Sequence, residues 1–157
     1  MPAAPPQLRP ATGADGPAAQ ALVSAVLVEY GLRPDPAGVD ADLRDIPASY
    51  TARGGDFAVL TDKSGALVGT CGLYPLADGA VELRKMYLAK AVRGRGQGRR
   101  LLDWALARAR ELGFKRMTLE TAGVLKEAIA LYEKNGFKPD EAGLHSCRCD
   151  TGYSREL

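Results

Sequence analysis

The chain has 157 residues, a length that fits one domain with its own hydrophobic core. Its composition is 46% hydrophobic and 25% charged, as expected for a globular protein, and a formal net charge of +2 offers no general electrostatic basis for binding nucleic acid or membranes. No apolar run approaches the ~20 residues that span a bilayer, and the N-terminus lacks the basic and apolar regions of a secretory signal. We therefore expect a cytoplasmic protein without nucleic-acid or membrane partners.

The side chains present disfavour both a metal centre and a disulfide framework. His145 is the single histidine, which excludes a multi-histidine metal site. The three cysteines, Cys71, Cys147 and Cys149, are an odd number, and the spacing of the last two is not that of a zinc knuckle. We expect reduced thiols and no bound metal.

The first third of the chain predicts a tail, a strand and a helix. Residues 1–7 are rich in Pro and Ala, and we expect them to be a disordered tail before a single domain over residues 8–157. Leu8–Ala11 fits a short strand, and Thr12 or Asp15 can cap a helix whose small and apolar residues recur with helical spacing as far as Gly31. Weaker helical signals over Pro34–Tyr50 predict a short helix and a mobile connector.

The middle of the chain predicts a β-meander. Phe57–Thr61 and Leu67–Leu76 form a predicted hairpin, and Ala80–Leu88 a third strand. In that third strand the apolar residues occupy odd positions at first, at 81 and 83, and even positions later, at 86 and 88. This change of phase predicts a β-bulge near Arg84–Lys85, although an imperfect edge strand would give the same pattern.

The second half of the chain alternates between helices and strands. The pattern predicts a helix over Gly98–Leu112, a strand over Met117–Thr121, a helix over Leu125–Lys134 and a last β segment from about Leu144 to Tyr153. The order of all these elements predicts an α/β (α+β) fold with a mixed sheet.

A basic, glycine-rich loop follows the third strand and opens the next helix. Its glycines, at positions 94, 96 and 98, let backbone N–H groups converge on one point, and a helix N-terminus favours an anion there. Arginines at positions 93, 95, 99 and 100 add positive charge. Together these features predict a cradle for a diphosphate, and a flexible surface loop with solvated arginines is the alternative.

The loop does not match two familiar phosphate-binding motifs. A Walker loop ends in Gly-Lys-Ser/Thr, whereas here Gly98 is followed by two arginines. A dinucleotide fingerprint, G-x-G-x-x-G, counted from Gly94 or Gly96 would end on Arg99 or Leu101. Glu120 nevertheless lies at about the right distance for a ribose-binding acid, so nicotinamide-dinucleotide binding stays as an alternative.

The loop, written Arg93-x-x-Gly96-x-Gly98, resembles the Gln/Arg-x-x-Gly-x-Gly/Ala motif of the GNAT superfamily, the Gcn5-related N-acetyltransferases. The resemblance continues through Glu82–Leu88, Leu119–Thr121 and Glu127–Phe137, and the sequence from Arg148 to Asp150 recurs in a subgroup of the family. It implies a GNAT-like mixed, mostly antiparallel sheet with a central splayed or bulged strand, flanked by about four helices. It also implies a small, single-domain, bacterial-type N-acetyltransferase with acetyl-CoA as co-substrate.

The same resemblance implies how acetyl-CoA is held. Backbone amides of residues 93–99 would bind the pyrophosphate, and the bulged strand would pair with the pantetheine arm as an added strand does. The cofactor-binding residues implied in this way are Met86, Tyr87, Leu88, Arg93, Gly94, Arg95, Gly96, Gln97, Gly98 and Arg99. Many relatives have an asparagine where this chain has Leu125, and a leucine there can only pack.

Amine acetylation needs a neutral amine and a proton for the departing thiolate. Tyr132 matches the family's tyrosine that protonates the thiolate, and a helix tyrosine packed in the core is the alternative. The resemblance also implies Glu82 as the candidate base, acting through water, because the family often has a glutamate on this strand, and a solvated strand glutamate is the alternative. Glu120 is a second candidate base.

The resemblance implies direct transfer, in a ternary complex, to a primary amine of a small molecule or peptide. Acceptor specificity in this family comes from segments that correspond here to Tyr30–Tyr50 and Asp140–His145. The candidate lining residues are Leu32, Tyr50, His145 and Tyr153. The sequence names neither the acceptor nor the oligomeric state, so a homodimer stays open. A catalytically silent acyl-CoA-binding regulatory module is the alternative function.

Overall fold

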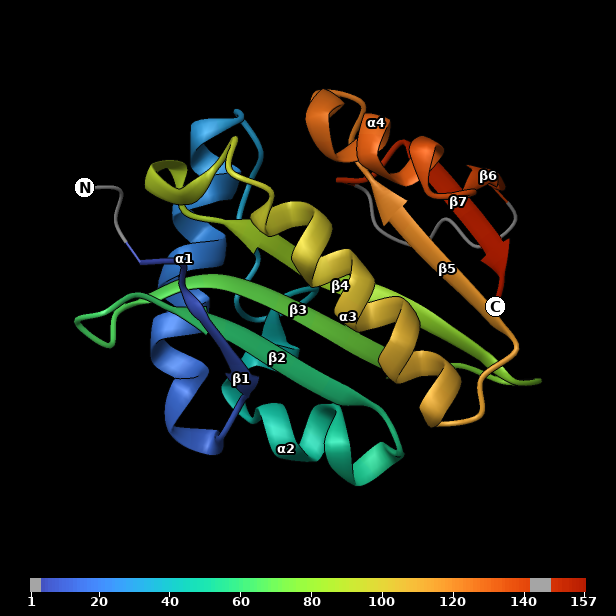
Figure 1. Cartoon of the computed structure of the whole chain (residues 1–157), viewed down its shortest axis with the longest axis horizontal. Coiled ribbons are helices and arrows are strands. Elements are labelled where there is room, and N and C mark those ends of the chain that lie inside the picture. The colour runs from blue at the N-terminus through green and yellow to red at the C-terminus, as the bar shows by residue number, and fades with distance from the viewer. Residues whose placement is uncertain (1–3, 142–147) are drawn as a thin grey trace.

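The computed structural model describes residues 4–141 and 148–157 of the chain. Within these residues, seven strands form one sheet in the order β1-β2-β3-β4-β5-β7-β6, and all neighbours are antiparallel except β4 and β5 (Figure 1). The strands are β1 (Gln7–Pro10), β2 (Asp56–Thr61), β3 (Leu67–Pro75), β4 (Ala80–Leu88), β5 (Arg116–Thr121), β6 (Lys138–Pro139) and β7 (Thr151–Glu156). The predicted mixed, mostly antiparallel sheet is confirmed.

Helices cover both faces of this sheet (Figure 1). In the described part of the chain the α-helices are α1 (Gly16–Glu29), α2 (Ile46–Ser49), α3 (Gln97–Glu111) and α4 (Lys126–Lys134). Short 3₁₀ helices are η1 (Gly13–Asp15), η2 (Ala41–Arg44), η3 (Thr51–Arg53) and η4 (Lys90–Val92). None of the helices in these residues is long and apolar enough to cross a membrane.

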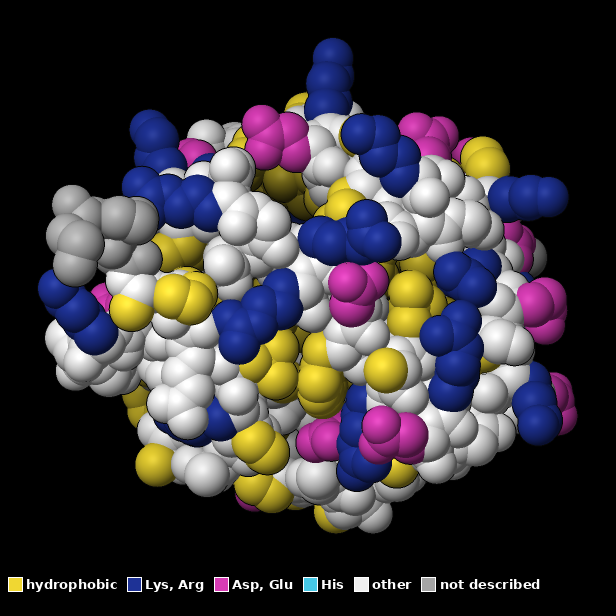
Figure 2. All heavy atoms as spheres, viewed as in Figure 1, with side chains coloured by type: hydrophobic (Ala, Val, Ile, Leu, Met, Phe, Trp, Pro, Cys, Tyr) yellow, Lys and Arg dark blue, Asp and Glu magenta, His cyan; other side chains and the backbone are white. Residues whose placement is uncertain are grey.

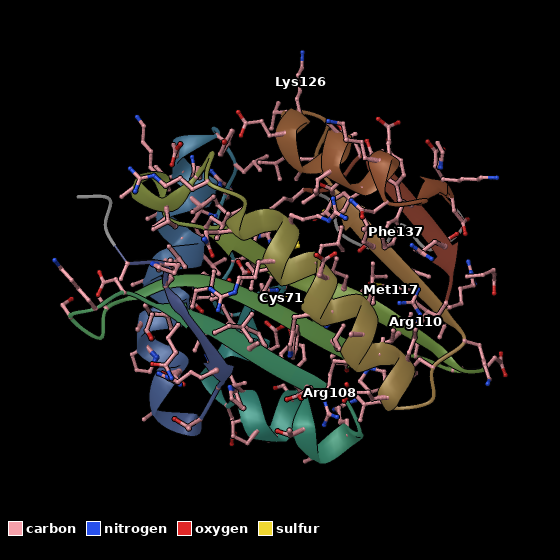
Figure 3. The ribbon with its side chains drawn as sticks, in the orientation of Figure 1. Cys71, Arg108, Arg110, Met117, Lys126 and Phe137 are labelled. Carbon is pink, nitrogen blue, oxygen red and sulfur yellow. The ribbon has the colours of Figure 1, made fainter. Side chains whose placement is uncertain are left out.

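Each face of the sheet has its own hydrophobic core. Val23 and Leu27 of α1 pack with Tyr50 and Phe57 on one face. Leu101 and other residues of α3 pack on the opposite face, in a cluster that includes Met117 of β5, Tyr132 of α4 and Phe137. In Figure 3, Met117 and Phe137 lie on the inside near α3, whereas Lys126 projects from α4 away from the sheet. The cores fix both layers of helices against the strands that carry the site.

The predicted β-bulge lies in β4 and is confirmed. Thr70 pairs with Tyr87 and Gly72 pairs with Arg84, so two residues of β4 oppose the single residue between them on β3. One of these two, Lys85, has a φ of 54°, a conformation that residues other than glycine rarely adopt. The Thr70 hydroxyl donates to the Lys85 carbonyl at 2.6 Å and supports this conformation. Because β4 lies between β3 and β5, the change of phase does not mark an edge strand.

β4 and β5 pair only where they begin. Their parallel register joins Ala80 to Arg116, Val81 to Met117 and Glu82 to Thr118. Beyond these residues the two strands diverge (Figure 1), and β5 pairs along its length with β7. The second half of β4 therefore has no strand partner on its β5 side within the described residues.

The end of the chain differs from the prediction of one β segment from about Leu144 to Tyr153. The part of that prediction before Arg148 lies outside the described residues. The strand β7 begins only at Thr151 and continues to Glu156, and the short β6 pairs with it. The later start has a local cause, because the Asp150 carboxylate accepts hydrogen bonds from the Gly123 amide and the Thr151 hydroxyl, both at 2.8 Å, and holds the chain at that turn.

Candidate active site

The loop before α3 presents a series of free backbone amides. Gly94 and Gly96 have φ values of 73° and 80°, which a residue with a Cβ rarely adopts. Gly96 caps α3, and the first amide bonded back to this cap is that of Arg100, at 3.1 Å from the Gly96 carbonyl. The amides of residues 94–99 donate to no acceptor in the described part of the chain. They are therefore open to an anion at the positive end of the α3 dipole.

Arg93 has a different environment from the rest of the predicted cradle. Its amide already donates to the Lys90 carbonyl at 3.3 Å. Its side chain donates to the Leu88 carbonyl at 3.0 Å and to Glu29 at 2.9 Å, and the guanidinium lies 5.3 Å from the centre of the Tyr30 ring. Arg93 thus binds the loop to the end of α1, a role that the sequence analysis missed because Glu29 and Tyr30 are more than sixty residues away.

A cavity of about 330 Å³, which we call the loop cavity, extends from these glycines along β4. Its wall includes eight of the ten predicted cofactor-binding residues, and lacks Arg95 and Gln97. Tyr30 of the α1 end and Leu131 of α4 also line it. Figure 2 shows a hollow between the start of α3 and α4, with hydrophobic side chains at its base and charged side chains at its rim. The site thus combines an apolar channel with an anion-binding mouth.

A second cavity of about 310 Å³, the strand-gap cavity, continues between β4 and β5. It shares Met86, Tyr87, Leu125 and Ala128 with the loop cavity, so the two are adjacent along β4. Its wall brings together Glu82 of β4, Glu120 of β5 and Tyr132 of α4, the three residues predicted as candidate base and acid. A molecule bound through both cavities would reach from the free amides to these three side chains.

Tyr132 packs in the hydrophobic core and also lines the strand-gap cavity. It is 5% exposed, and its ring meets that of Phe137 edge to face at 5.7 Å. Its hydroxyl makes no hydrogen bond with a described residue. Burial raises the pKa of the phenol well above its usual range, so the group stays protonated at physiological pH. The two alternatives considered for this residue are therefore compatible, because the ring packs while the hydroxyl remains available as a proton donor.

Glu82 is held by a neighbour on its own strand. The Arg84 Nε donates to the Glu82 carboxylate, and the Arg84 guanidinium lies 3.7 Å from the centre of the Tyr74 ring. Glu82 is 5% exposed, so it is not a solvated strand glutamate. The sequence analysis did not single out Arg84, although its spacing of two residues from Glu82 places both side chains on the same face of a strand.

A buried cluster of charges includes two residues of the strand-gap cavity wall, Lys85 and Arg148. Lys85 Nζ is 3.2 Å from Asp40 and 3.3 Å from Asp42, and Arg148 donates to both oxygens of Asp40, at 2.9 and 2.8 Å. Burial alone would raise the pKa of Asp40, but hydrogen bonds from Arg148 and from the Asp35 amide, with the charge of Lys85, lower it to about 2. The cluster joins the connector after α1, the bulge and the segment before β7.

The candidate acceptor residues are not all placed together. Leu32 lines the strand-gap cavity, as do Arg148 and Cys149. Tyr50 lies in the core and donates to Asp42, while Tyr153 lines a third cavity that shares Glu82 and Glu120 with the strand-gap cavity. His145 lies outside the described residues.

No group of three or more His, Cys, Asp or Glu side chains is placed to hold a metal ion within the described residues. Cys71 is buried and carries a free thiol, and Cys149 is partly exposed. Cys147 lies outside the described residues.

Comparisons with known protein sequences match this chain to N-acetyltransferases. A family model described as "Acetyltransferase (GNAT) family" matches residues 23–137. The chain is 41% identical over 161 aligned residues to the uncharacterized N-acetyltransferase YjgM of Escherichia coli (strain K12), and the alignment covers 97% of this chain and 95% of that protein.

Solved structures show the same fold. An acetyltransferase of the GNAT family from Staphylococcus aureus Mu50 superposes with a TM-score of 0.91 at 23% identity, over 97% of this chain and 99% of that one. A GNAT superfamily phosphinothricin acetyltransferase from Sinorhizobium meliloti, determined in complex with AcCoA, superposes with a TM-score of 0.77 at 25% identity, over 98% of this chain and 89% of that one.

Proposed function

This chain belongs to the GNAT family of acetyltransferases, and from that premise we propose that it transfers the acetyl group of acetyl-CoA directly to a primary amine in a ternary complex. The observation that carries the proposal is the continuity of the site. Free amides at residues 94–99 lie at one end, and Glu82 and Tyr132 lie at the other. The Sinorhizobium meliloti relative binds AcCoA, which supports the same ligand here.

The residues of the loop fit the CoA moiety by their chemistry. The amides of residues 94–99 would hold the pyrophosphate at the α3 N-terminus. The unpaired side of β4, from Met86 to Leu88, would pair with the amides of the pantetheine arm, because those backbone groups have no strand partner within the described residues. Leu125, in the walls of both cavities, offers only an apolar contact where many relatives have an asparagine.

Acetyl-CoA supplies an acetyl group activated as a thioester, which an amine nitrogen can attack. Glu82 would take a proton from the incoming ammonium, directly or through a water, so that the nitrogen becomes nucleophilic. Tyr132 would donate its phenolic proton to the sulfur as the C–S bond breaks.

Two alternatives make different demands on the site. A nicotinamide dinucleotide would need a small residue in place of Arg99 or Leu101, and Glu120 to reach a ribose. Instead, Glu120 lines the same strand-gap cavity as Glu82. A silent acyl-CoA sensor would have no chemical need for an unbonded Tyr132 hydroxyl in a cavity that Glu82 also lines. Both observations favour the enzyme.

Ligand-induced stabilisation tests the proposal. Acetyl-CoA should raise the melting temperature, because a ligand that binds only the native state stabilises it, whereas NAD(H) should not. Stabilisation by NAD(H) without any stabilisation by acetyl-CoA would favour the dinucleotide-binding alternative over the acetyltransferase. A second assay, CoA release with polyamines, amino acids, aminoglycosides and N-terminal peptides, separates enzyme from sensor: tight acetyl-CoA binding with no turnover in the whole panel would favour the sensor.

A further inference from the structure

Glu82 and Arg84 form an ion pair in the wall of the strand-gap cavity. Both residues lie on one face of β4 and belong to the wall of the strand-gap cavity. The Arg84 guanidinium is fixed twice, by its Nε bond to Glu82 and by stacking on Tyr74. A planar guanidinium held in this way loses little freedom when it binds a further group.

Both members of the pair keep unused hydrogen-bonding capacity. Only one oxygen of Glu82 accepts a hydrogen bond, and only the Nε of Arg84 donates one, among the described residues. The second oxygen of Glu82 and the two terminal nitrogens of Arg84 are thus available. An open acceptor beside open donors is complementary to a cation and an anion that lie close together in one small molecule.

The other cations of the cavity wall are already neutralised. Lys85 is bound by Asp40 and Asp42, and Arg148 donates to both oxygens of Asp40. Glu120 lines the wall opposite from β5 and adds a second carboxylate near Glu82. Among these groups, Arg84 is the cation with terminal donors to spare, so an anionic group on the acceptor would bind there.

We propose that the acceptor is an α-amino acid or a similarly compact zwitterion, whose ammonium binds at Glu82 and whose carboxylate binds the terminal nitrogens of Arg84. This inference rests on the proposed function and names the substrate class of the same site. A simple amine would satisfy Glu82 and leave the donors of Arg84 without a partner. When Glu82 accepts the proton of the ammonium, it loses its negative charge and releases its hold on Arg84, which then binds the carboxylate alone.

The first test compares matched acceptors with the wild-type enzyme. L-amino acids, their amides and the corresponding decarboxylated amines carry the same side chain and differ at the carboxylate, for example L-phenylalanine, L-phenylalaninamide and phenethylamine. The acid should have a kcat/KM roughly 10- to 100-fold above its amide and its amine, because they lack the group that pairs with Arg84. Equal or better use of the amides and amines across the panel would overturn the inference.

The second test uses substitutions at Arg84 to change the preference for the acid over the amine. Arg84→Met should lower the ratio of kcat/KM for the acid to kcat/KM for the amine roughly 10- to 100-fold, mainly through a higher KM for the acid, whereas Arg84→Lys should retain part of the preference. Arg53→Met is the matched control, since Arg53 also lies over the Tyr74 ring, at 5.4 Å, but does not line the cavity. The control should keep the full preference.

An equal loss for acid and amine in Arg84→Met would mean that Arg84 only holds Glu82, and the inference would fail. Acetyl-CoA affinity, measured by calorimetry on each variant, reports whether the fold and the cofactor site are intact. Acetylation of amines with no advantage for the acid would remove this inference and leave the proposed function standing. Absence of both acetyl-CoA binding and turnover would instead remove the proposed function.

Discussion

Tyr132 combines a packed ring with an unbonded hydroxyl in the strand-gap cavity, and this combination makes a sharp prediction. Tyr132→Phe keeps the ring and its packing but removes the proton donor. We expect kcat to fall by about 10²- to 10⁴-fold, the usual range for acid–base catalysis, with acetyl-CoA affinity nearly intact. Steady-state kinetics together with calorimetry give both values. An unchanged kcat would reduce Tyr132 to a packing residue.

The raised pKa of the phenol adds a pH dependence to this prediction. Because burial holds the pKa of Tyr132 well above its usual range, the donor stays protonated in alkaline solution. Deprotonation of Tyr132 should therefore not lower the kcat of the wild-type enzyme at any pH up to about 9. The pH profiles of kcat for the wild type and for Tyr132→Phe should have the same shape in this range.

Glu82 and Glu120 are distinguished by the pH at which each substitution matters. If Glu82 takes the proton of the amine, Glu82→Gln should depress the rate most at low pH, where little free amine exists. The deficit should shrink as the pH approaches the pKa of the amine, because the substrate then deprotonates without help. Glu120→Gln is the comparison, and kcat/KM against pH is the measurement. If Glu82→Gln lowers kcat/KM equally at every pH, Glu82 is a positioning residue. If the deficit shrinks with rising pH only in Glu120→Gln, Glu120 is the base.

At the scale of the element, α3 has a left-handed glycine at each end. Gly96 caps the N-terminus with a φ of 80°, and Gly113 follows the C-terminus with a φ of 88°. A Cβ at either position would meet no atom within 4 Å, so substitution brings conformational strain and no clash. Alanine at either position should destabilise the protein by roughly 1–2 kcal/mol.

The two substitutions should differ in ligand binding. Gly96→Ala strains the loop that carries the free amides, so it should weaken acetyl-CoA binding as well as stability. Gly113→Ala, at the other end of the same helix, should lower the melting temperature by a similar amount and leave the affinity unchanged. Urea unfolding and calorimetry on both variants give the comparison, and equal affinities would show that the loop amides do not hold the ligand.

At the scale of the molecule, Asp40 ties three distant segments together through Lys85 and Arg148. Its pKa of about 2 in the folded protein lies below the ~4 of an unfolded chain. A lowered pKa stabilises the fold above about pH 4, and this contribution is lost as the pH falls from about 4 to about 2.

Asp40→Asn should therefore destabilise the protein most near neutral pH, by about 3 kcal/mol, since it removes the carboxylate that Lys85 and Arg148 share. The gap between the wild-type and variant free energies of unfolding should shrink as the pH falls from about 4 to about 2. Asp103→Asn is the control, because the Arg99–Asp103 pair is exposed and such pairs contribute little. A gap that stays constant between pH 7 and pH 2 would contradict the assigned linkage.

Much of the fold was predictable because its signals are local. The span of β4 was predicted with its observed bounds, Ala80–Leu88, since turn residues precede it and the alternation of its side chains is clear. The bulge was predictable as well, because an extra residue shifts the phase of that alternation. The glycines of the loop were recognisable for the same reason, since a left-handed backbone requires them whatever the rest of the chain does.

Other features required the tertiary structure. The helix α1 is apolar on all sides, so its spacing predicts a helix but not its buried face, which is formed by Ala19, Val23, Val26 and Leu27 once α1 packs on the sheet. The two-residue strand β6 has no periodicity to read, and it exists only because β7 lies beside it.

The candidate site divides along the same line. The sequence by itself determined the candidates, namely a glycine-rich loop, a strand glutamate and a helix tyrosine, because each lies in a local segment that resembles the GNAT family. Only the tertiary structure decided which residues surround these candidates, namely the Arg93–Glu29 contact, the stacking of Arg84 on Tyr74 and the Asp40 cluster. Such contacts join residues far apart in the chain, and a charged side chain takes its partner from whichever segment the packing of the two cores brings within reach.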